Sequence, residues 1–391
     1  MNRPTPRLTY RRLAPLRILG GLMLLSCTLA AHAGLGNIAQ EWLKLGKFKE
    51  TVATPVATLH VHGDIWGLAF SPDGRLLAAS APLTAHIQLW DWRHHRLLRR
   101  FRKVASDLTS TTPLAFSPNG QLLASCTSGS LTAAVRIWNV QTGAVVRDLP
   151  GPGQISNCDA VAFTPDGRSL VRVSEQMVRP GNTLMVYSTR TWQPRWGLQT
   201  QPFHPSTLAL SPHGRWAVLG GYRPDQNPLL AEHEQLLVLD LQRHTVVRTI
   251  PTFPPPPREF INGTLVTVSS GLAHAVVWRP GSSVVALGQF GAAPGLGNLI
   301  RLYDVQTGAL KAQESGAPGI RVYALTYSAD GRYLVESGLY RHHAQVIEIW
   351  DGAHQHLLQK ISGSAGALAA APDGHYLAMG AGNKIMVWRL K

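Results

Sequence analysis

The sequence predicts an all-β fold, a seven-bladed β-propeller of four-stranded antiparallel blades, and three observations support this prediction. From residue 51 onward, short apolar runs of strand length alternate with sequences that form tight turns. One hairpin sequence, first met as Ser71-Pro72-Asp73-Gly74, recurs to give seven copies. The prolines of its first four copies are 46, 47 and 47 residues apart, and four-stranded units of this size are typical of blades around an axis.

The first repeat shows how each blade is built. An apolar run over 65–70 ends at the turn, where Pro72 presets φ and Gly74 accepts the left-handed conformation that closes a hairpin. A second strand follows at 76–79, a third alternates over 86–90, and a fourth covers 96–101. One such sheet cannot bury both of its faces alone, so neighbouring copies must pack against each other.

The hairpin and the end of the third strand recur in register along the chain. The later hairpins cover 114–120, 161–167, 208–214, 276–281, 325–331 and 368–374. The third strands end at Trp90-Asp91, Trp138-Asn139, Tyr187-Ser188, Leu239-Asp240, Tyr303-Asp304, Trp350-Asp351 and Trp388-Arg389. The last copy stops after its third strand, at 384–390, and an unassigned strand at 56–60 precedes the first copy. We expect this early strand to complete the seventh blade and close the ring.

The Trp-Asp pairs and the hairpins quoted above resemble those of WD-repeat β-propellers over residues 51–391. The resemblance implies a protein-interaction platform rather than an enzyme. The Gly-His pair that usually opens such a repeat is missing, because His62-Gly63 is only its reverse. The acid expected between the second and third strands is also absent from 81–85. We therefore expect blades held together by apolar packing instead of the family's buried hydrogen-bond network, as in a degenerate propeller of the exported bacterial type.

Residues 1–33 are predicted to be an export signal peptide. Five arginines and no acid begin the chain, residues 18–30 are apolar, and Ala31-His32-Ala33 is a small-x-small cleavage sequence before Gly34. An apolar run of about 13 residues is too short to span a bilayer permanently. The prediction is a periplasmic or secreted protein, with a lipid anchor at Cys27 and a twin-arginine signal at Arg11-Arg12 as alternatives.

Residues 34–50 are predicted to form a short helical lead-in to the propeller, because Leu35, Ile38, Trp42 and Leu45 share one helical face. The signal peptide carries five of the 37 basic residues and none of the 22 acids, so residues 34–391 keep a formal net charge of +10. Outside the cytoplasm, such a surface favours an acidic or envelope-associated protein partner. Scattered basic residues in an exported chain argue against nucleic acid, and we expect a chain that is monomeric by itself.

The irregular residues gather at one end of the predicted blades. The long segments 175–181, 221–234, 288–298 and 338–344 connect second to third strands or one blade to the next. Loops on a rigid frame are common binding sites, and aromatic and Arg side chains are common anchors. The candidate partner-binding residues are Arg179, Tyr222, Arg223, Tyr340, Arg341, His342 and His343. The alternative is that these are ordinary solvated loop tips.

The opposite end carries a basic residue at one turn position of four hairpins, which are Arg75, Arg168, Arg215 and Arg332. This set is either a basic docking rim or a series of polar turn tips. The segment 252–257 contains four consecutive prolines and favours a stiff extended connector.

The sequence predicts no catalytic residue, no metal site and no cofactor. The clusters His94-His95, His342-His343 and His354-Gln355-His356 lie in or beside turns without acidic or thiol partners at ligand spacing. No nucleophile elbow, phosphate loop or zinc-protease sequence occurs. The alternative function is a propeller enzyme, lactonase-like or dependent on a quinone or metal, with its site in the central funnel. That site would need polar ligands on the innermost strands, which are apolar and small.

Two cysteines remain after the signal peptide, Cys126 and Cys158. Cys126 closes the second strand of blade two, and Cys158 opens the first strand of blade three. Both positions lie toward the loop end of neighbouring blades. An exported chain meets oxidising conditions, so the pair is predicted to form either a disulfide or two separate buried thiols.

Overall fold

The structure is a computed structural model. It describes residues 51–81, 84, 86–102, 113–126, 135–150, 156–176, 183–223, 233–252, 259–261, 264–266, 275–289, 299–315, 319–340, 345–363 and 366–391. The chain divides into two compact units, residues 1–47 and 48–391, and only the second contains described residues. The predicted signal peptide, Cys27, the twin-arginine pair and the lead-in at 34–50 lie outside the described residues.

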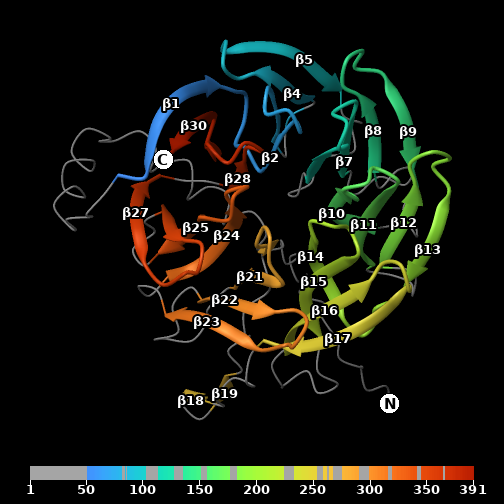
Figure 1. The fold of residues 1–391 in the computed structure, drawn as a ribbon, viewed down its shortest axis with the longest axis vertical. Coiled ribbons are helices and arrows are strands. Elements are labelled where there is room, and N and C mark those ends of the chain that lie inside the picture. Colours follow the sequence, from blue (N-terminus) through green and yellow to red (C-terminus); the bar gives the residue numbers. More distant parts are fainter. Residues whose placement is uncertain are drawn as a thin grey trace, which may run out of the picture. The chain divides into compact units, whose positions relative to one another are not determined.

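The described residues form seven sheets of four antiparallel strands, arranged as a β-propeller, as the sequence predicts. Within blades one to six the strands follow chain order, with the first innermost and the fourth on the outer rim (Figure 1). Blade one holds β2 (Gly67–Phe70), β3 (Leu76–Ser80), β4 (His86–Asp91) and β5 (Arg96–Arg102); blade two holds β6 (Leu114–Phe116), β7 (Leu122–Cys126), β8 (Val135–Asn139) and β9 (Val145–Leu149); blade three holds β10 (Ser156–Phe163), β11 (Ser169–Gln176), β12 (Leu184–Ser188) and β13 (Pro194–Leu198). Blade four holds β14 (His204–Leu210), β15 (Trp216–Arg223), β16 (His233–Asp240) and β17 (Thr245–Pro251); blade five holds β20 (Ala275–Trp278), β21 (Val284–Gly288), β22 (Leu299–Asp304) and β23 (Leu310–Ser315); blade six holds β24 (Gly319–Tyr327), β25 (Tyr333–Tyr340), β26 (Gln345–Asp351) and β27 (Leu357–Ser362).

The seventh blade joins the two ends of the propeller. It holds β28 (Ala367–Ala370), β29 (Tyr376–Ala381) and β30 (Lys384–Leu390), and β1 (Ala53–His60) is its outer strand. β1 runs antiparallel to β30, from the pair Ala53 and Leu390 to the pair His60 and Lys384. The predicted closure is therefore confirmed, with a strand that begins three residues earlier than the expected 56–60. The side chain of Gln359 in blade six adds a further tie, because its Oε1 accepts the Ala53 N–H at 2.8 Å.

A short hairpin lies between blades four and five, formed by β18 (Glu259–Ile261) and β19 (Thr264–Val266). The sequence predicts only a stiff connector in this part of the chain, and the prolines at 254–257 lie outside the described residues. The hairpin was missed because its strands have three residues each, too few to show a period of two.

The hairpin between the first and second strands is locked by side chains of the repeated sequence. In blade one the Ser71 hydroxyl donates to Asp73 at 2.5 Å and accepts the Leu76 N–H at 2.8 Å. The Asp73 carboxylate also accepts the Arg75 N–H at 3.1 Å. Partial burial raises the pKa of Asp73, but these hydrogen bonds outweigh it and hold that pKa below its usual value. Equivalent locks join Ser117 to Asn119, Thr164 to Asp166 and Ser328 to Asp330.

A second side chain caps the turn between the third and fourth strands. Asp240 accepts the N–H groups of Gln242 and Arg243 at 2.9 and 3.0 Å, and Asp304 caps its own turn in the same way. The fourth residue after the cap has a positive φ. It is Gly143 or Gly308 in two blades, and His95, Trp192 and His244 occupy the same place elsewhere. The histidines at 94–95 and 244 therefore belong to turns.

The core lies between the blades. The second residue of every second strand is completely buried, and these residues are Leu77, Leu123, Leu170, Ala217, Val285, Leu334 and Leu377. The aromatic residues before the caps are buried too, but the indole N–H groups of Trp90, Trp350 and Trp388 have no hydrogen-bond partner among the described residues. Adhesion between blades thus comes mainly from apolar packing, as the missing Gly-His pair and acid suggest.

Candidate interaction surfaces

The propeller has two ends that differ in how the chain turns. At the end that we call the loop face, second strands end, third strands begin and the chain passes from blade to blade. At the opposite end, the tight-turn face, the locked hairpins and the capped turns lie. Two of the candidate partner-binding residues, Tyr222 and Arg223, end β15 on the loop face, where they pair with Glu234 and His233.

The Tyr222 ring stacks on His204 with centroids 5.1 Å apart, and Arg223 is exposed. Tyr340 ends β25 on the same face. Arg179, Arg341, His342 and His343 lie outside the described residues. The structure therefore places three of the seven candidates on one face, but it gives no contact that joins them.

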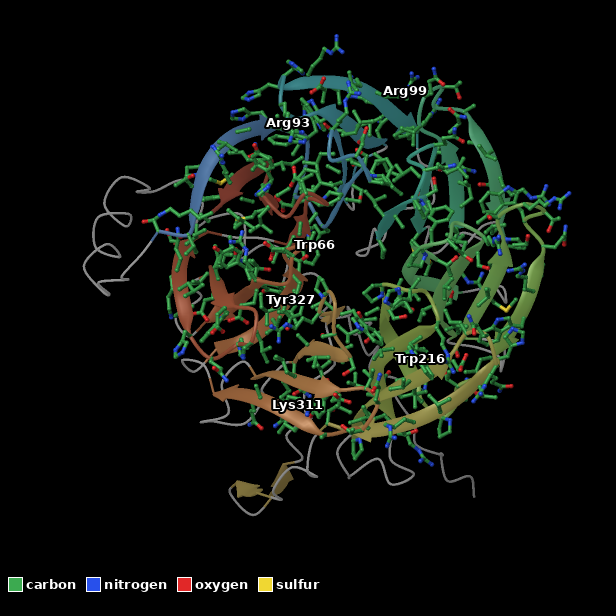
Figure 2. All side chains as sticks on the ribbon, viewed as in Figure 1. Trp66, Arg93, Arg99, Trp216, Lys311 and Tyr327 are labelled. Atoms are coloured by element: carbon green, nitrogen blue, oxygen red, sulfur yellow. A yellow bond between two sulfur atoms is a disulfide. The ribbon has the colours of Figure 1, made fainter. Side chains whose placement is uncertain are left out.

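Trp66 is a loop-face residue that the sequence reasoning missed. It immediately precedes β2, its N–H donates to the Ser80 carbonyl at 3.0 Å, and its side chain is 47% exposed while neighbouring Ile65 is buried. Figure 2 shows Trp66 toward the inner end of its blade, near the middle of the ring. The available signal was the alternation of an inner strand: Ile65 faces the core, so its neighbour faces away. A large exposed ring on a rigid frame is a common anchor for a protein partner.

The four arginines of the tight-turn face do not form a uniform basic rim. Arg215 donates to the buried Asp240 carboxylate at 3.1 Å. Arg332 pairs with Asp330 at 2.5 Å and donates to the Lys391 carbonyl at 2.8 Å. Two of the four charges are therefore offset by carboxylates of their own blade, while Arg75 and Arg168 are exposed.

The tight-turn face also carries two cavities, one on each side of the first hairpin of blade four. A cavity of about 440 Å³ lies between blades four and five and is lined by Ser211, Pro212, His213, Arg215, Trp216, Trp278, Gly281, Ser282, Ser283, Val305 and Gln306. A second, of about 430 Å³, lies between blades three and four, against Arg195, Trp196, His213 and His244. Sequence reasoning found neither cavity, because each is formed by residues of two blades.

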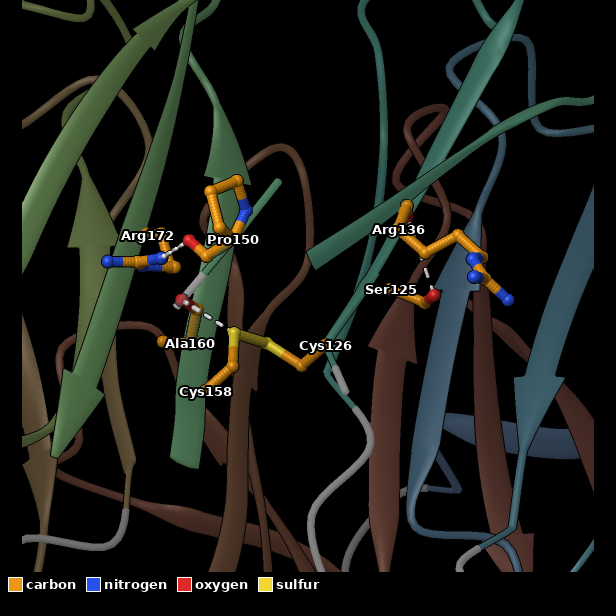
Figure 3. Close-up of a disulfide and its surroundings, with 7 residues drawn as sticks. All are labelled: Ser125, Cys126, Arg136, Pro150, Cys158, Ala160 and Arg172. Carbon is orange, nitrogen blue, oxygen red and sulfur yellow. Dashed lines mark hydrogen bonds between the residues drawn. A yellow bond between two sulfur atoms is a disulfide. The ribbon is translucent and has the colours of Figure 1, made fainter. Parts of the chain in front are cut away.

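A disulfide joins blades two and three. Cys126 ends β7 and Cys158 lies in β10, with their sulfur atoms 2.01 Å apart and their Cα atoms 5.3 Å apart (Figure 3). Beside it, the buried Arg172 side chain donates to the Pro150 carbonyl at 2.7 Å, which ties the end of blade two to the same junction. Burial lowers the pKa of Arg172, and the nearby Tyr187 ring partly offsets that effect. Of the two arrangements open from the sequence, the structure has the bonded one.

A buried polar cluster joins blades four and five. The Thr252 carbonyl accepts hydrogen bonds from Arg301 and from the Tyr303 hydroxyl, the latter at 3.1 Å. The Glu234 carboxylate lies beside the Thr252 hydroxyl at 3.4 Å, and burial raises its pKa well above the ordinary value. Burial also raises the pKa of Tyr303 to about 12. Glu234, Thr252, Arg301 and Tyr303 are all buried, so the cluster fastens the chain as it leaves blade four and offers no open site to a substrate.

Within the described parts of the chain, no three His, Cys, Asp or Glu side chains come together as metal ligands. The same residues include no helix that is long and apolar enough to cross a membrane. Among the innermost strands, β2 carries the small and apolar residues Leu68-Ala69-Phe70, whereas β10, β14 and β24 also carry polar residues, such as Asp159, Thr207 and Arg321.

Comparison with known proteins finds one matching family model and several similar proteins. The family model "WD domain, G-beta repeat" matches residues 53–91 and 110–139. Similar proteins include WD repeat-containing protein VIP3 of Arabidopsis thaliana, 31% identical over 22% of this chain and 30% of that protein. Eukaryotic translation initiation factor 3 subunit I of Aspergillus fumigatus is 33% identical over 30% of this chain and 33% of its own length. The chain thus spans about a third of the length of the curated relatives that it matches.

The first match covers β1, the outer strand of blade seven, and β2, β3 and β4 of blade one, and the second covers β6, β7 and β8 of blade two. The other blades have the same order of four antiparallel strands. WD-repeat propellers typically act as scaffolds for protein interactions. The chain is therefore a seven-bladed β-propeller, and two of its repeats match the WD-repeat family model.

Proposed function

We propose that this protein is a non-enzymatic interaction platform of the bacterial cell envelope, and that it binds a protein partner through the loop face. The observation that carries the proposal is the exposed Trp66 ring on a face that also presents Tyr222 and Arg223. Tyr, Trp and Arg are the residues most enriched at the energetic centres of interfaces. The curated relative named as a subunit of an initiation factor gives a precedent for a WD-repeat protein that works inside an assembly.

The export part of the proposal has two supports. The first 33 residues carry the basic, apolar and small-residue segments of a signal peptide. The Cys126–Cys158 disulfide fits an oxidising compartment better than a reducing one. Fractionation of cells, followed by N-terminal sequencing, tests this part. A mature chain that begins at Gly34 in the periplasm or the medium supports it, whereas an intact Met1 in the cytoplasm contradicts it.

Affinity capture from envelope fractions tests the binding face. Trp66→Ala and Arg223→Glu remove an exposed ring and reverse an exposed charge, so each should reduce the recovered partner at least about tenfold if the loop face is used. Leu98→Ala is the matched control, because Leu98 is 38% exposed on the outer strand β5 of the same blade as Trp66. Equal recovery with all three variants would contradict the assignment of this face.

A further inference from the structure

The hairpin tips of the tight-turn face carry a charge pattern that is broken in two adjacent blades. The third hairpin residue is an acid or its amide in five blades, namely Asp73, Asn119, Asp166, Asp330 and Asp373. Blade four has His213 in this place, and blade five has Gly281. The two blades that lack both the acid and its amide are the ones that flank the cavity of about 440 Å³.

The turn in blade four keeps its shape without the acid. The Gly214 N–H still donates to the Ser211 carbonyl at 2.8 Å, and the Trp216 N–H still donates to the Ser211 hydroxyl at 3.0 Å. His213 is exposed at the lip of both cavities. These hairpin hydrogen bonds therefore form without an acid at position 213, and His213 leaves this part of the face without the carboxylate that most other hairpins carry.

The cavity itself combines aromatic walls with cationic groups. Trp216 and Trp278 line it from blades four and five, and the Trp278 indole is held by a hydrogen bond to the Ser282 carbonyl at 2.8 Å. The Arg215 guanidinium lies 4.6 Å from the centre of the Trp216 ring. Figure 2 shows Trp216 on blade four, inside the outer rim of the ring.

The charges around the cavity are two arginines and two carboxylates, and the arginines are the accessible ones, because the Arg215 and Arg243 side chains are 43% and 74% exposed whereas Asp240 is fully buried. The buried Asp240 carboxylate faces two arginines, with Arg215 at 3.1 Å and Arg243 at 4.0 Å. The Asp304 carboxylate is buried as well, where it accepts the Ser283 hydroxyl at 2.8 Å and caps its own turn. Ser283 and Gln306 supply the remaining polar lining. The chain as a whole has a formal net charge of +15.

We propose that the cavity between blades four and five binds an acidic peptide segment of a partner protein. An apolar or aromatic side chain of the peptide packs between Trp216 and Trp278, and a neighbouring carboxylate lies against Arg215 and His213. The accessible arginines, the burial of both carboxylates and the missing hairpin acids favour this occupant over a basic or a purely apolar one. The site is independent of the loop face, so failure of the proposed function leaves it standing.

A random dodecapeptide display library, panned against the full chain, tests the class of ligand. The proposal expects recovered peptides in which Asp or Glu adjoins Phe, Trp, Leu or Ile. Recovery of basic peptides, or of none above the background of an unrelated protein, overturns it. The most enriched peptide then serves as the probe in fluorescence anisotropy.

Substitutions of one charge locate the site. His213→Asp restores the usual hairpin acid, so it should preserve or raise the unfolding midpoint while it weakens the peptide roughly fivefold through repulsion at the cavity lip. Gln306→Glu adds a charge to the cavity from an exposed turn position and should weaken the peptide by a similar factor. If His213 had a purely structural role, the His213→Asp variant would not bind the peptide more weakly while its unfolding midpoint stayed the same or rose.

Matched controls come from blade two. Asn119→Asp makes the same kind of hairpin change away from the cavity, and Gln141→Glu changes the turn residue that corresponds to Gln306. Both controls should leave the affinity within about twofold of the wild type. The proposal is overturned when controls and cavity variants weaken the peptide alike, or when neither cavity variant weakens it.

Discussion

Reduction of the Cys126–Cys158 disulfide should destabilise the propeller by an amount that follows from its place in the chain. The bond closes a loop with a sequence separation of 32 residues and joins two neighbouring blades. In the chain-entropy treatment, closure of such a loop lowers the entropy of the unfolded chain by an amount equivalent to about 3.7 kcal/mol at 25 °C. This is a large part of the about 5–15 kcal/mol that stabilises a typical domain.

The assay is urea unfolding of residues 34–391, followed by tryptophan fluorescence, with and without dithiothreitol. Reduction should lower the free energy of unfolding by about 3–4 kcal/mol. A Cys126→Ala/Cys158→Ala variant should be destabilised and should not respond to the reductant. A loss below about 1 kcal/mol on reduction, or two free thiols by mass spectrometry of protein from the oxidising compartment, would refute the reasoning.

Three further predictions concern the blades themselves. Leu59→Ala should lower the free energy of unfolding by about 2–5 kcal/mol, because Leu59 is 2% exposed in the closing strand. Val56→Ala, at a site 45% exposed in the same strand, should lower it by less than about 0.5 kcal/mol. Equal effects of the two variants in urea unfolding would mean that β1 does not close the blade. His95→Gly should stabilise by about 1 kcal/mol, because His95 is exposed and has a φ of 54° that favours glycine; a fall in the thermal midpoint would contradict this. The pKa of Asp330 lies at about 2, below the ordinary 3.8, because the hydrogen bonds and charge around it outweigh its partial burial. Its stabilising contribution is therefore present above pH 3.8 and lost as the pH falls toward 2. Asp330→Asn should make the free energy of unfolding fall less steeply with decreasing pH below 3.8. An unchanged pH dependence would show that this carboxylate does not contribute.

The repeat made most of this fold predictable from sequence. A hairpin that recurs with a proline, an acid and a glycine fixes both the turn and the register of the strands beside it. An unclear strand boundary in one blade can therefore be assigned from the matching position in the others. The closure by residues 53–60 was predictable for the same reason, since the seventh copy has only three strands and the strand before the first copy belongs to no other blade. The exception is the β18–β19 hairpin, which stands outside the repeat.

The candidate site was less predictable, because a surface depends on which residues of different blades come together. Trp66 looked like one residue of an apolar run, and its 47% exposure beside the buried Ile65 shows that it faces outward. His213 looked like an ordinary variant of the turn, and its proposed role in binding follows from the cavity that it lines. Conversely, Arg215 and Arg332 looked like members of a basic rim, but each is paired with a carboxylate, Arg332 with Asp330 of its own hairpin and Arg215 with the distant Asp240.

Site-specific photocrosslinking tests the central claim, binding through the loop face, most directly. A benzoylphenylalanine is placed at Trp66 on the loop face or at Leu98 on the outer strand of the same blade, where the exposures are 47% and 38%. The account predicts that the partner crosslinks from position 66 and not from position 98. Crosslinking from position 98 with none from position 66 would contradict it.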